Sequence, residues 1–401
     1  MPKKILIIDD SALMRRVISD IINKGNEYEV AAIAKDGEEG YRLIASNPNL
    51  YSAVILDINM PKMNGLQLLR QLQKDHIEQT VIIVSTVAKE GAKETIQALE
   101  YGAFDFVTKP ENYLETKSEA FMKNIHEMLD VATSTKKTIE RVSASSVKPV
   151  REQKFSNINR NTVTRQKDND RLSAAAEAMT ALRSKNFVQN TAPAKKVDGK
   201  LYAEVKKGSA KVVALACSTG GPKSLQQVIP MLPKGLDAGV VLVQHMPAGF
   251  TASLAQRLDE MSDVRVKEAE DGDIIRRGWV YIAPGGKHIR VVKNASGHKI
   301  QLSEEPAIDG LRPCANIMYE SLAKCSYDEI TCVVLTGMGS DGTKGIKELS
   351  DKNKKIYVIA QDEDTSVVYG MPKAIAQTGL VNEVVPLNRV AEVITKNVGV
   401  S

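Results

Sequence analysis

Short apolar runs recur along the first 130 residues, separated by stretches with helical periodicity. The runs are four or five residues long and rich in Ile, Val, Leu and Ala. Such runs indicate strands buried on both faces, as in parallel sheets whose consecutive strands are joined by helices. We therefore predict a doubly wound, flavodoxin-like α/β domain over residues 1–130, with strands near 5–8, 30–34, 53–56, 81–84 and 104–107.

The same pattern returns at residue 211 and predicts a second doubly wound, Rossmann-like parallel-sheet domain over 211–401. Its strands are expected near 211–216, 240–243, 280–283, 331–335 and 355–359, with an added hairpin over 288–293 and 299–302.

Residues 131–210 differ from both flanking domains, because Ser, Thr, Asn, Lys and Arg dominate and the apolar periodicity fades. The stretch 136–210 contains 17 Lys and Arg residues against 7 Asp and Glu residues, although the net charge of the whole chain is only +5. This composition predicts a long, flexible basic linker. One amphipathic pattern inside it, over 168–185, is compatible with a short helix.

Composition limits the class of protein. A hydrophobic content of 43% suits a globular chain, no apolar stretch approaches a membrane span, and the N-terminus has no signal peptide. The four cysteines have no metal-ligand spacing and are expected to be reduced. We therefore expect a cytoplasmic protein with no membrane insertion. We also expect no nucleic acid partner, since the positive charge is concentrated in the linker.

Polar residues follow the predicted strands of the first domain, where ligands of doubly wound sheets bind. Asp9, Asp10 and Asp57 would converge there, and three neighbouring carboxylates require a cation such as Mg²⁺. An aspartate beside that ion can accept a phosphoryl group, while Lys109 and a hydroxyl from the strand end Ser85-Thr86 bind its oxygens. Each acid alone could be a turn residue, but their agreement across the strand ends favours a site.

The stretches "ILIIDDSALMRR", "VILDINMPKMNGLQLL", "VIIVST" and "GAFDFVTKP" resemble the receiver domain of bacterial response regulators. This resemblance implies that Asp57 is the phosphoacceptor, and that Asp9, Asp10 and the Asn59 carbonyl help to bind Mg²⁺. It also implies a switch hydroxyl at Ser85, with Thr86 as an alternative, and the remaining switch residues Phe106 and Lys109.

The second domain has a different set of strand-end residues. Ser218, His245 and Asp341 each follow a predicted strand, and a serine, a histidine and an aspartate together suit acyl transfer. Glycines at 220, 221 and 339 would allow close approach of a substrate. Cys217 is a competing nucleophile, but neighbouring side chains of a strand face opposite ways, so Cys217 is expected in the core.

Three alternative functions are possible for this domain. "GMGSDGTK" differs from a P-loop because Thr343 and Lys344 are in the wrong order, which disfavours nucleotide binding. A receiver could also precede a DNA-binding output domain, but that domain is usually a smaller helix-turn-helix unit. A non-catalytic output domain that only docks receptors is a further alternative.

The stretches "ACSTGGPKSLQQVIPMLP", "VVLVQHMPAGFTASLAQRLD", "YIAPGGKHIRV" and "VVLTGMGSDGTKGIKEL" resemble the catalytic domain of the chemotaxis protein-glutamate methylesterases, the CheB family. The resemblance implies a Ser218 nucleophile, a His245 base and an Asp341 that orients it, without a cofactor for the esterase reaction. It places Thr219 and Met338, with Gly220 and Gly221, near the oxyanion and substrate. The implied partners are methyl-accepting chemoreceptors and the histidine kinase CheA, and the implied reactions are ester hydrolysis and glutamine deamidation.

Overall fold

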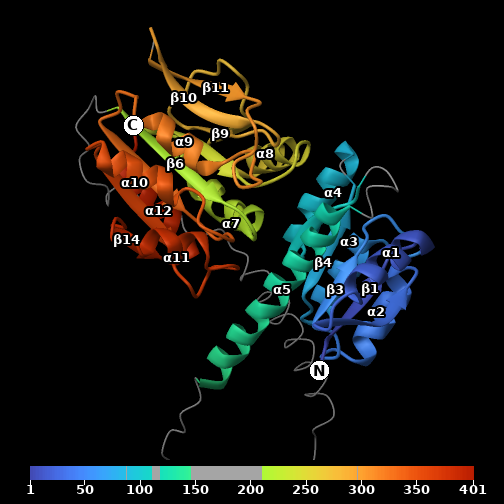
Figure 1. The fold of residues 1–401 in the computed structure, drawn as a ribbon. Coiled ribbons are helices and arrows are strands. Elements are labelled where there is room, and N and C mark those ends of the chain that lie inside the picture. Colours follow the sequence, from blue (N-terminus) through green and yellow to red (C-terminus); the bar gives the residue numbers. More distant parts are fainter. Residues whose placement is uncertain (87, 111–117, 146–209, 296) are drawn as a thin grey trace, which may run out of the picture. The chain divides into compact units, whose positions relative to one another are not determined.

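The structure is a computed structural model that describes residues 1–86, 88–110, 118–145, 210–295 and 297–401 (Figure 1). The predicted helix over 168–185 lies outside the described residues. Within those residues, no helix combines the length and the apolar character that crossing a bilayer requires.

The N-terminal sheet has five parallel strands in the order β2-β1-β3-β4-β5, the flavodoxin-like order. All five predicted strands are present, and the predicted fold class is confirmed for this part of the chain. The strands are β1 (Lys3–Ile8), β2 (Tyr28–Ala34), β3 (Ala53–Leu56), β4 (Val81–Ser85) and β5 (Asp105–Thr108).

Helices cover both faces of this sheet (Figure 1). On one face α1 (Ala12–Ile22) and α5 (Glu119–Ser145) pack against side chains such as Ile5 and Ile7. On the other face lie α2 (Gly37–Ser46), α3 (Gly65–Lys74) and α4 (Lys89–Glu100). The central strands β1, β3 and β4 are therefore buried on both sides, which explains their unbroken apolar runs.

Local sequence signals determine where the first helices begin. The side chains of Ser11, Asp36 and Asn64 each accept a hydrogen bond from a backbone N–H in the first turn of the following helix. Each such cap contributes about 1 kcal/mol to helix stability. The caps also end the loops that contain Asp9, Asp10 and the residues after Asp57.

Helix α5 continues past residue 130 to Ser145, so the segment predicted as linker from 131 begins inside a helix. Polar composition does not reveal that the helix continues past residue 130. Thr133, for example, is buried and its hydroxyl donates to the Leu129 carbonyl, a contact that polar composition alone does not reveal.

The C-terminal sheet has seven parallel strands in the order β14-β13-β12-β6-β7-β9-β8. The five predicted strands correspond to β6 (Lys211–Cys217), β7 (Ala238–Gln244), β9 (Trp279–Ile282), β12 (Glu329–Val334) and β13 (Ile356–Gln361). Chain order reverses between β6 and β12, which makes this pair the switch point where ligands of doubly wound sheets bind.

The predicted hairpin is present as β10 (His288–Asn294) and β11 (Gly297–Ser303), which pair antiparallel in a separate sheet. Two strands were not predicted, β8 (Arg265–Glu268) and β14 (Glu383–Val385). Both are short edge strands, and β8 reads Arg-Val-Lys-Glu, so neither has the apolar run of a central strand.

Two helical layers cover the C-terminal sheet. On one face lie α7 (Gly221–Val228), α8 (Phe250–Met261) and α12 (Val390–Val398). On the other lie the hairpin, α9 (Ala315–Leu322), α10 (Thr343–Asp351) and α11 (Met371–Ala376).

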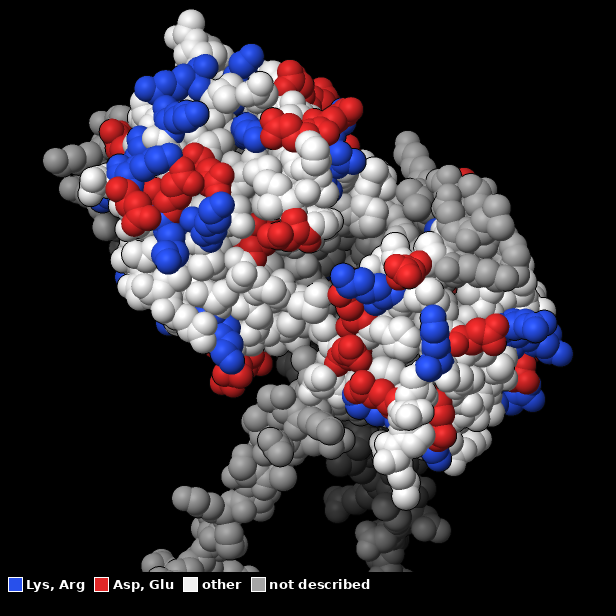
Figure 2. Space-filling model, viewed as in Figure 1, with Lys and Arg blue, Asp and Glu red and all other residues white. Residues whose placement is uncertain are grey.

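On the face drawn in Figure 2, the described Lys and Arg side chains are interspersed with Asp and Glu.

Candidate active site

The predicted acidic cluster forms at the carboxyl ends of β1 and β3. Asp9, Asp10 and Asp57 each offer a carboxylate oxygen, and these three atoms lie within 4.8 Å of one another. Oxygen donors in this number and charge suit Mg²⁺, so the residues fit that ion. The Asn59 side chain donates to Glu94 Oε2 at 2.9 Å, so only its backbone carbonyl concerns the predicted site.

Lys109 follows β5 and reaches this cluster. Its Nζ lies 2.9 Å from Asp9 Oδ2 and 2.8 Å from Asp57 Oδ1. Burial raises the pKa of Asp57 to about 6, while the Lys109 ammonium opposes that shift. Burial also acts to lower the pKa of Lys109, but the two carboxylates outweigh it and raise that pKa. Asp57, the predicted phosphoacceptor, is thus paired with the Lys109 ammonium.

The predicted switch residues Ser85 and Phe106 lie on β4 and β5, which are neighbours in the sheet. Ser85 ends β4 and is buried, whereas Thr86 is exposed. The Ser85 hydroxyl lies within hydrogen-bond distance of two acceptors, the carbonyl oxygens of Thr86 and Gly91, each at 3.4 Å. Phe106 is half-buried on β5. These positions are compatible with the switch roles that the receiver resemblance implies.

Strand register brings the predicted nucleophile and base together. Cys217 at the end of β6 pairs with Gln244 at the end of β7, so Ser218 and His245 are the next residues on neighbouring strands. The His245 N–H donates to the Cys217 carbonyl at 3.1 Å, and the Ser218 N–H donates to the Thr336 carbonyl at 3.0 Å. These backbone bonds join the ends of β12, β6 and β7, so Ser218 lies at the switch point and His245 lies beside it.

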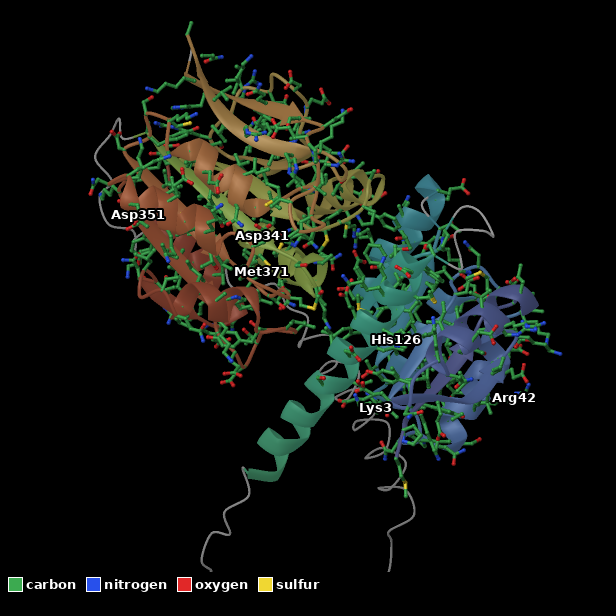
Figure 3. The ribbon with its side chains drawn as sticks, in the orientation of Figure 1. Lys3, Arg42, His126, Asp341, Asp351 and Met371 are labelled. Carbon is green, nitrogen blue, oxygen red and sulfur yellow. The ribbon has the colours of Figure 1, made fainter. Side chains whose placement is uncertain are left out.

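Asp341, labelled in Figure 3, lies in the loop between β12 and α10 and contacts the imidazole. Its Oδ2 lies 2.8 Å from His245 Nε2. With Nε2 bound to the carboxylate, Nδ1 is the ring nitrogen that can accept the Ser218 proton. Among the described residues no hydrogen bond joins the Ser218 hydroxyl to the ring, and such bonds often tighten only when substrate binds.

The N-terminus of α9 holds the Asp341 carboxylate in place. The N–H groups of Ala315 and Asn316 donate to it at 2.6 and 3.0 Å, and the Cys314 thiol lies 3.2 Å from Oδ1. Burial alone would raise the pKa of Asp341, but the His245 contact and these backbone donors lower it to about 2. The carboxylate is therefore ionised and fixed in direction.

The remaining predicted site residues surround Ser218. Gly220 has a φ of 74°, and a Cβ there would lie 2.5 Å from Val367 Cβ, so only glycine fits this turn. Gly221 donates its N–H to the Ser218 carbonyl at 2.7 Å, which removes that N–H as an oxyanion donor. The Thr219 carbonyl accepts from the Thr336 hydroxyl at 3.0 Å. Met338 is exposed, as a substrate-contacting residue should be.

Cys217 is fully buried, as strand alternation predicts, and burial raises the pKa of its thiol. A buried, protonated thiol is a poor nucleophile. This environment favours Ser218 over Cys217 as the attacking residue.

Gln244 and Asn316 also contact the site residues, although neither is predicted from the sequence. The Asn316 side-chain oxygen accepts from the N–H groups of Gly342 and Gly345 at 3.0 and 2.8 Å, which ties the Asp341 loop to α9. No spacing rule joins Asn316 to Asp341, since the contact depends on how α9 packs. Gln244 did carry a signal, because it is a polar residue at the end of an apolar strand, directly before His245.

Comparison with known proteins gives matches for both parts of the chain. The response regulator receiver domain model matches residues 5–119, and the CheB methylesterase model matches residues 213–394. The protein-glutamate methylesterase/protein-glutamine glutaminase of Pyrococcus horikoshii is 40% identical over 396 residues, covering 98% of this chain and 93% of that protein. The Bacillus subtilis protein of the same name is 37% identical, covering 98% of this chain and 97% of that protein. The crystal structure of the Thermotoga maritima CheB methylesterase catalytic domain is 42% identical with a TM-score of 0.45, covering 47% of this chain and 100% of that chain.

Proposed function

We propose, because the chain belongs to the CheB family of protein-glutamate methylesterases, that it hydrolyses γ-methyl esters of glutamate on methyl-accepting chemoreceptors and releases methanol. The observation that carries this proposal is the buried His245–Asp341 pair at 2.8 Å, beside the strand end that bears Ser218. The reaction would take place in the cytoplasm, where the receptor glutamates are accessible.

Ser218 Oγ attacks the ester carbonyl while Nδ1 of His245 takes its proton, which forms a tetrahedral intermediate. The ionised Asp341 stabilises the imidazolium and keeps Nε2 as the nitrogen bound to the carboxylate. Thr219 and Met338 contribute to the surroundings of the oxyanion and substrate, as the family resemblance implies. Collapse of the intermediate transfers the proton to the leaving methoxide, so methanol departs and an acyl-enzyme remains.

Water then replaces methanol. His245 removes a proton from the water, the hydroxide adds to the acyl carbonyl, and Ser218 leaves with the proton returned by the imidazole. The product is the receptor's glutamate side chain with a free γ-carboxylate, and Ser218 is regenerated. The same steps convert glutamine to glutamate with release of ammonia, so deamidation belongs to the proposal. The esterase residues named here require no cofactor for these steps.

Regulation would come from the N-terminal sheet. Asp57 accepts a phosphoryl group from the histidine kinase CheA, and Asp9, Asp10 and the Asn59 carbonyl would hold the Mg²⁺ that neutralises charge during transfer. The added negative charge attracts Lys109 and Ser85, which rearranges the strand ends near Phe106 and relieves inhibition of the esterase.

Methanol release from membranes with methylated chemoreceptors tests the proposal. The full chain should release methanol, and Ser218→Ala should not. If the wild-type chain binds these membranes but releases no methanol, the domain only docks receptors. A shift of duplex DNA that weakens with salt would instead favour a DNA-binding output domain.

A further inference from the structure

Gln244 is a buried polar residue that the proposed chemistry does not use. It ends β7, is 2% exposed and immediately precedes His245. Across the ladder it pairs with Cys217, which immediately precedes Ser218. Its side chain therefore lies between the two strand ends that carry the nucleophile and the base.

The Gln244 amide bonds to both of those residues. Its Nε2 donates to the Ser218 carbonyl at 3.1 Å and to the His245 carbonyl at 3.0 Å. Only the nitrogen can serve two carbonyl acceptors, so the amide orientation follows from its partners. Both amide hydrogens are used, and they join the backbones of two residues that are 27 positions apart in the chain.

The other end of the amide is fixed as well. Cys217 Sγ lies 3.0 Å from Oε1 and supplies a donor to it. The Gln244 amide fits only because residue 221 is a glycine, since a Cβ at that position would lie 2.0 Å from Gln244 Oε1. The thiol and the missing side chain together hold the amide in one orientation, which gives Cys217 and Gly221 a shared structural role.

We propose that Gln244 is a positioning residue that sets the distance and angle between Ser218 and His245, with Cys217 and Gly221 holding its amide. This inference rests on the proposed Ser-His-Asp function. Its physical basis is that a displacement of about 1 Å between reacting groups can cost about 100-fold in rate. The amide limits such displacement, since any separation of the strand ends would break one of its two bonds.

The test compares Gln244→Met, which keeps side-chain length and removes both donors, with Thr331→Val in the full chain. Thr331 is fully buried in β12 and accepts a hydrogen bond from Asn397 Nδ2 at 2.8 Å, so its variant removes a buried bond from the same sheet. We expect Gln244→Met to lower kcat for methanol release by about 10- to 100-fold with KM changed by less than about threefold. Thr331→Val should stay within about twofold of the wild-type kcat.

A second readout removes the receptor from the measurement. Covalent labelling of Ser218 by a fluorophosphonate, followed by mass spectrometry, needs the nucleophile and base but no receptor recognition. Gln244→Met should label about 10-fold or more slowly than wild type, and Thr331→Val should label at the wild-type rate. Equal labelling rates for wild type and Gln244→Met would overturn the positioning role. A wild-type chain that labels at Ser218 but releases no methanol would overturn the proposed substrate and leave the positioning test decisive.

Cys217 provides a milder pair of variants should Gln244→Met fail to fold. Cys217→Ser keeps a donor to Oε1 and should retain wild-type labelling within about twofold. Cys217→Ala removes the donor and should slow labelling by about three- to fivefold, because the amide keeps its bonds to the two carbonyls. Equal rates for these two variants would contradict the role assigned to the thiol.

Discussion

His245 Nε2 and Asp341 Oδ2 lie 2.8 Å apart, and the same Asp341 oxygen accepts the Ala315 N–H at 2.6 Å. A single carboxylate oxygen thus contacts both the imidazole and the first residue of α9. A helix N-terminus favours negative charge, so α9 helps to keep Asp341 ionised next to the ring. Orientation of the base and anchoring of a helix therefore depend on the same side chain.

Removing the nucleophile or the base should abolish hydrolysis. We expect Ser218→Ala and His245→Ala each to lower kcat by on the order of 10³-fold or more, measured as methanol release. Phosphorylation of Asp57 should be unaffected, since it depends on the other sheet. Cys217→Ala is the matched variant at the neighbouring position and should lower the rate by no more than about three- to fivefold. The reverse ranking of the alanine variants at 217 and 218 would identify Cys217 as the nucleophile.

Asp341→Asn should change how stability depends on pH. The pKa of Asp341 is lowered from 3.8 to about 2 in the folded state. The free energy that this carboxylate adds to folding is therefore fully present above its unfolded-state pKa, and it is lost as pH falls through about 2. The full contribution is about 2 kcal/mol. Urea unfolding followed by the fluorescence of Trp279, the one tryptophan of the chain, reports on the C-terminal sheet.

The wild-type free energy of unfolding should therefore fall more steeply than that of Asp341→Asn between about pH 5 and pH 2.5. Asp351→Asn, at the end of α10, is a control that removes a carboxylate for which no such contacts exist in the described structure. Parallel pH profiles for wild type and Asp341→Asn would contradict the lowered pKa.

The basic segment between the two sheets should be dispensable for hydrolysis. Deleting residues 150–200 should leave kcat within about threefold of wild type, because the entropy of closing a loop changes slowly with its length. Circular dichroism would verify that both sheets are folded. Loss of methanol release in a folded deletion variant would show that this segment contributes to the site or to receptor contact.

The N-terminal sheet should restrain the esterase until Asp57 is phosphorylated. A fragment of residues 208–401 should release methanol faster than the unphosphorylated full chain. A small-molecule phosphodonor with Mg²⁺ should raise the rate of the full chain, and either Asp57→Asn or removal of Mg²⁺ by EDTA should prevent that rise. Identical rates for the fragment and the unphosphorylated chain would rule out inhibition by this sheet.

Much of the fold and site could be read from the sequence because both depend on local patterns. Central strands of a doubly wound sheet are buried on both faces, so β1, β6 and β12 appear as apolar runs that need no alignment to detect. Ligands bind at the carboxyl ends of such strands, so the polar residue after each run is a candidate by position alone. That reasoning found Asp57, Ser218 and His245.

Tertiary structure decided what local patterns do not encode. The edge strands β8 and β14 form because neighbouring strands offer them partners, and the last turns of α5 are helical although their composition resembles a linker. The register that sets Cys217 against Gln244 determines which side chains meet at the site. Contacts of Asp341 with α9 and of Gln244 with two carbonyls join residues far apart in the chain, and only packing brings such groups within hydrogen-bond distance.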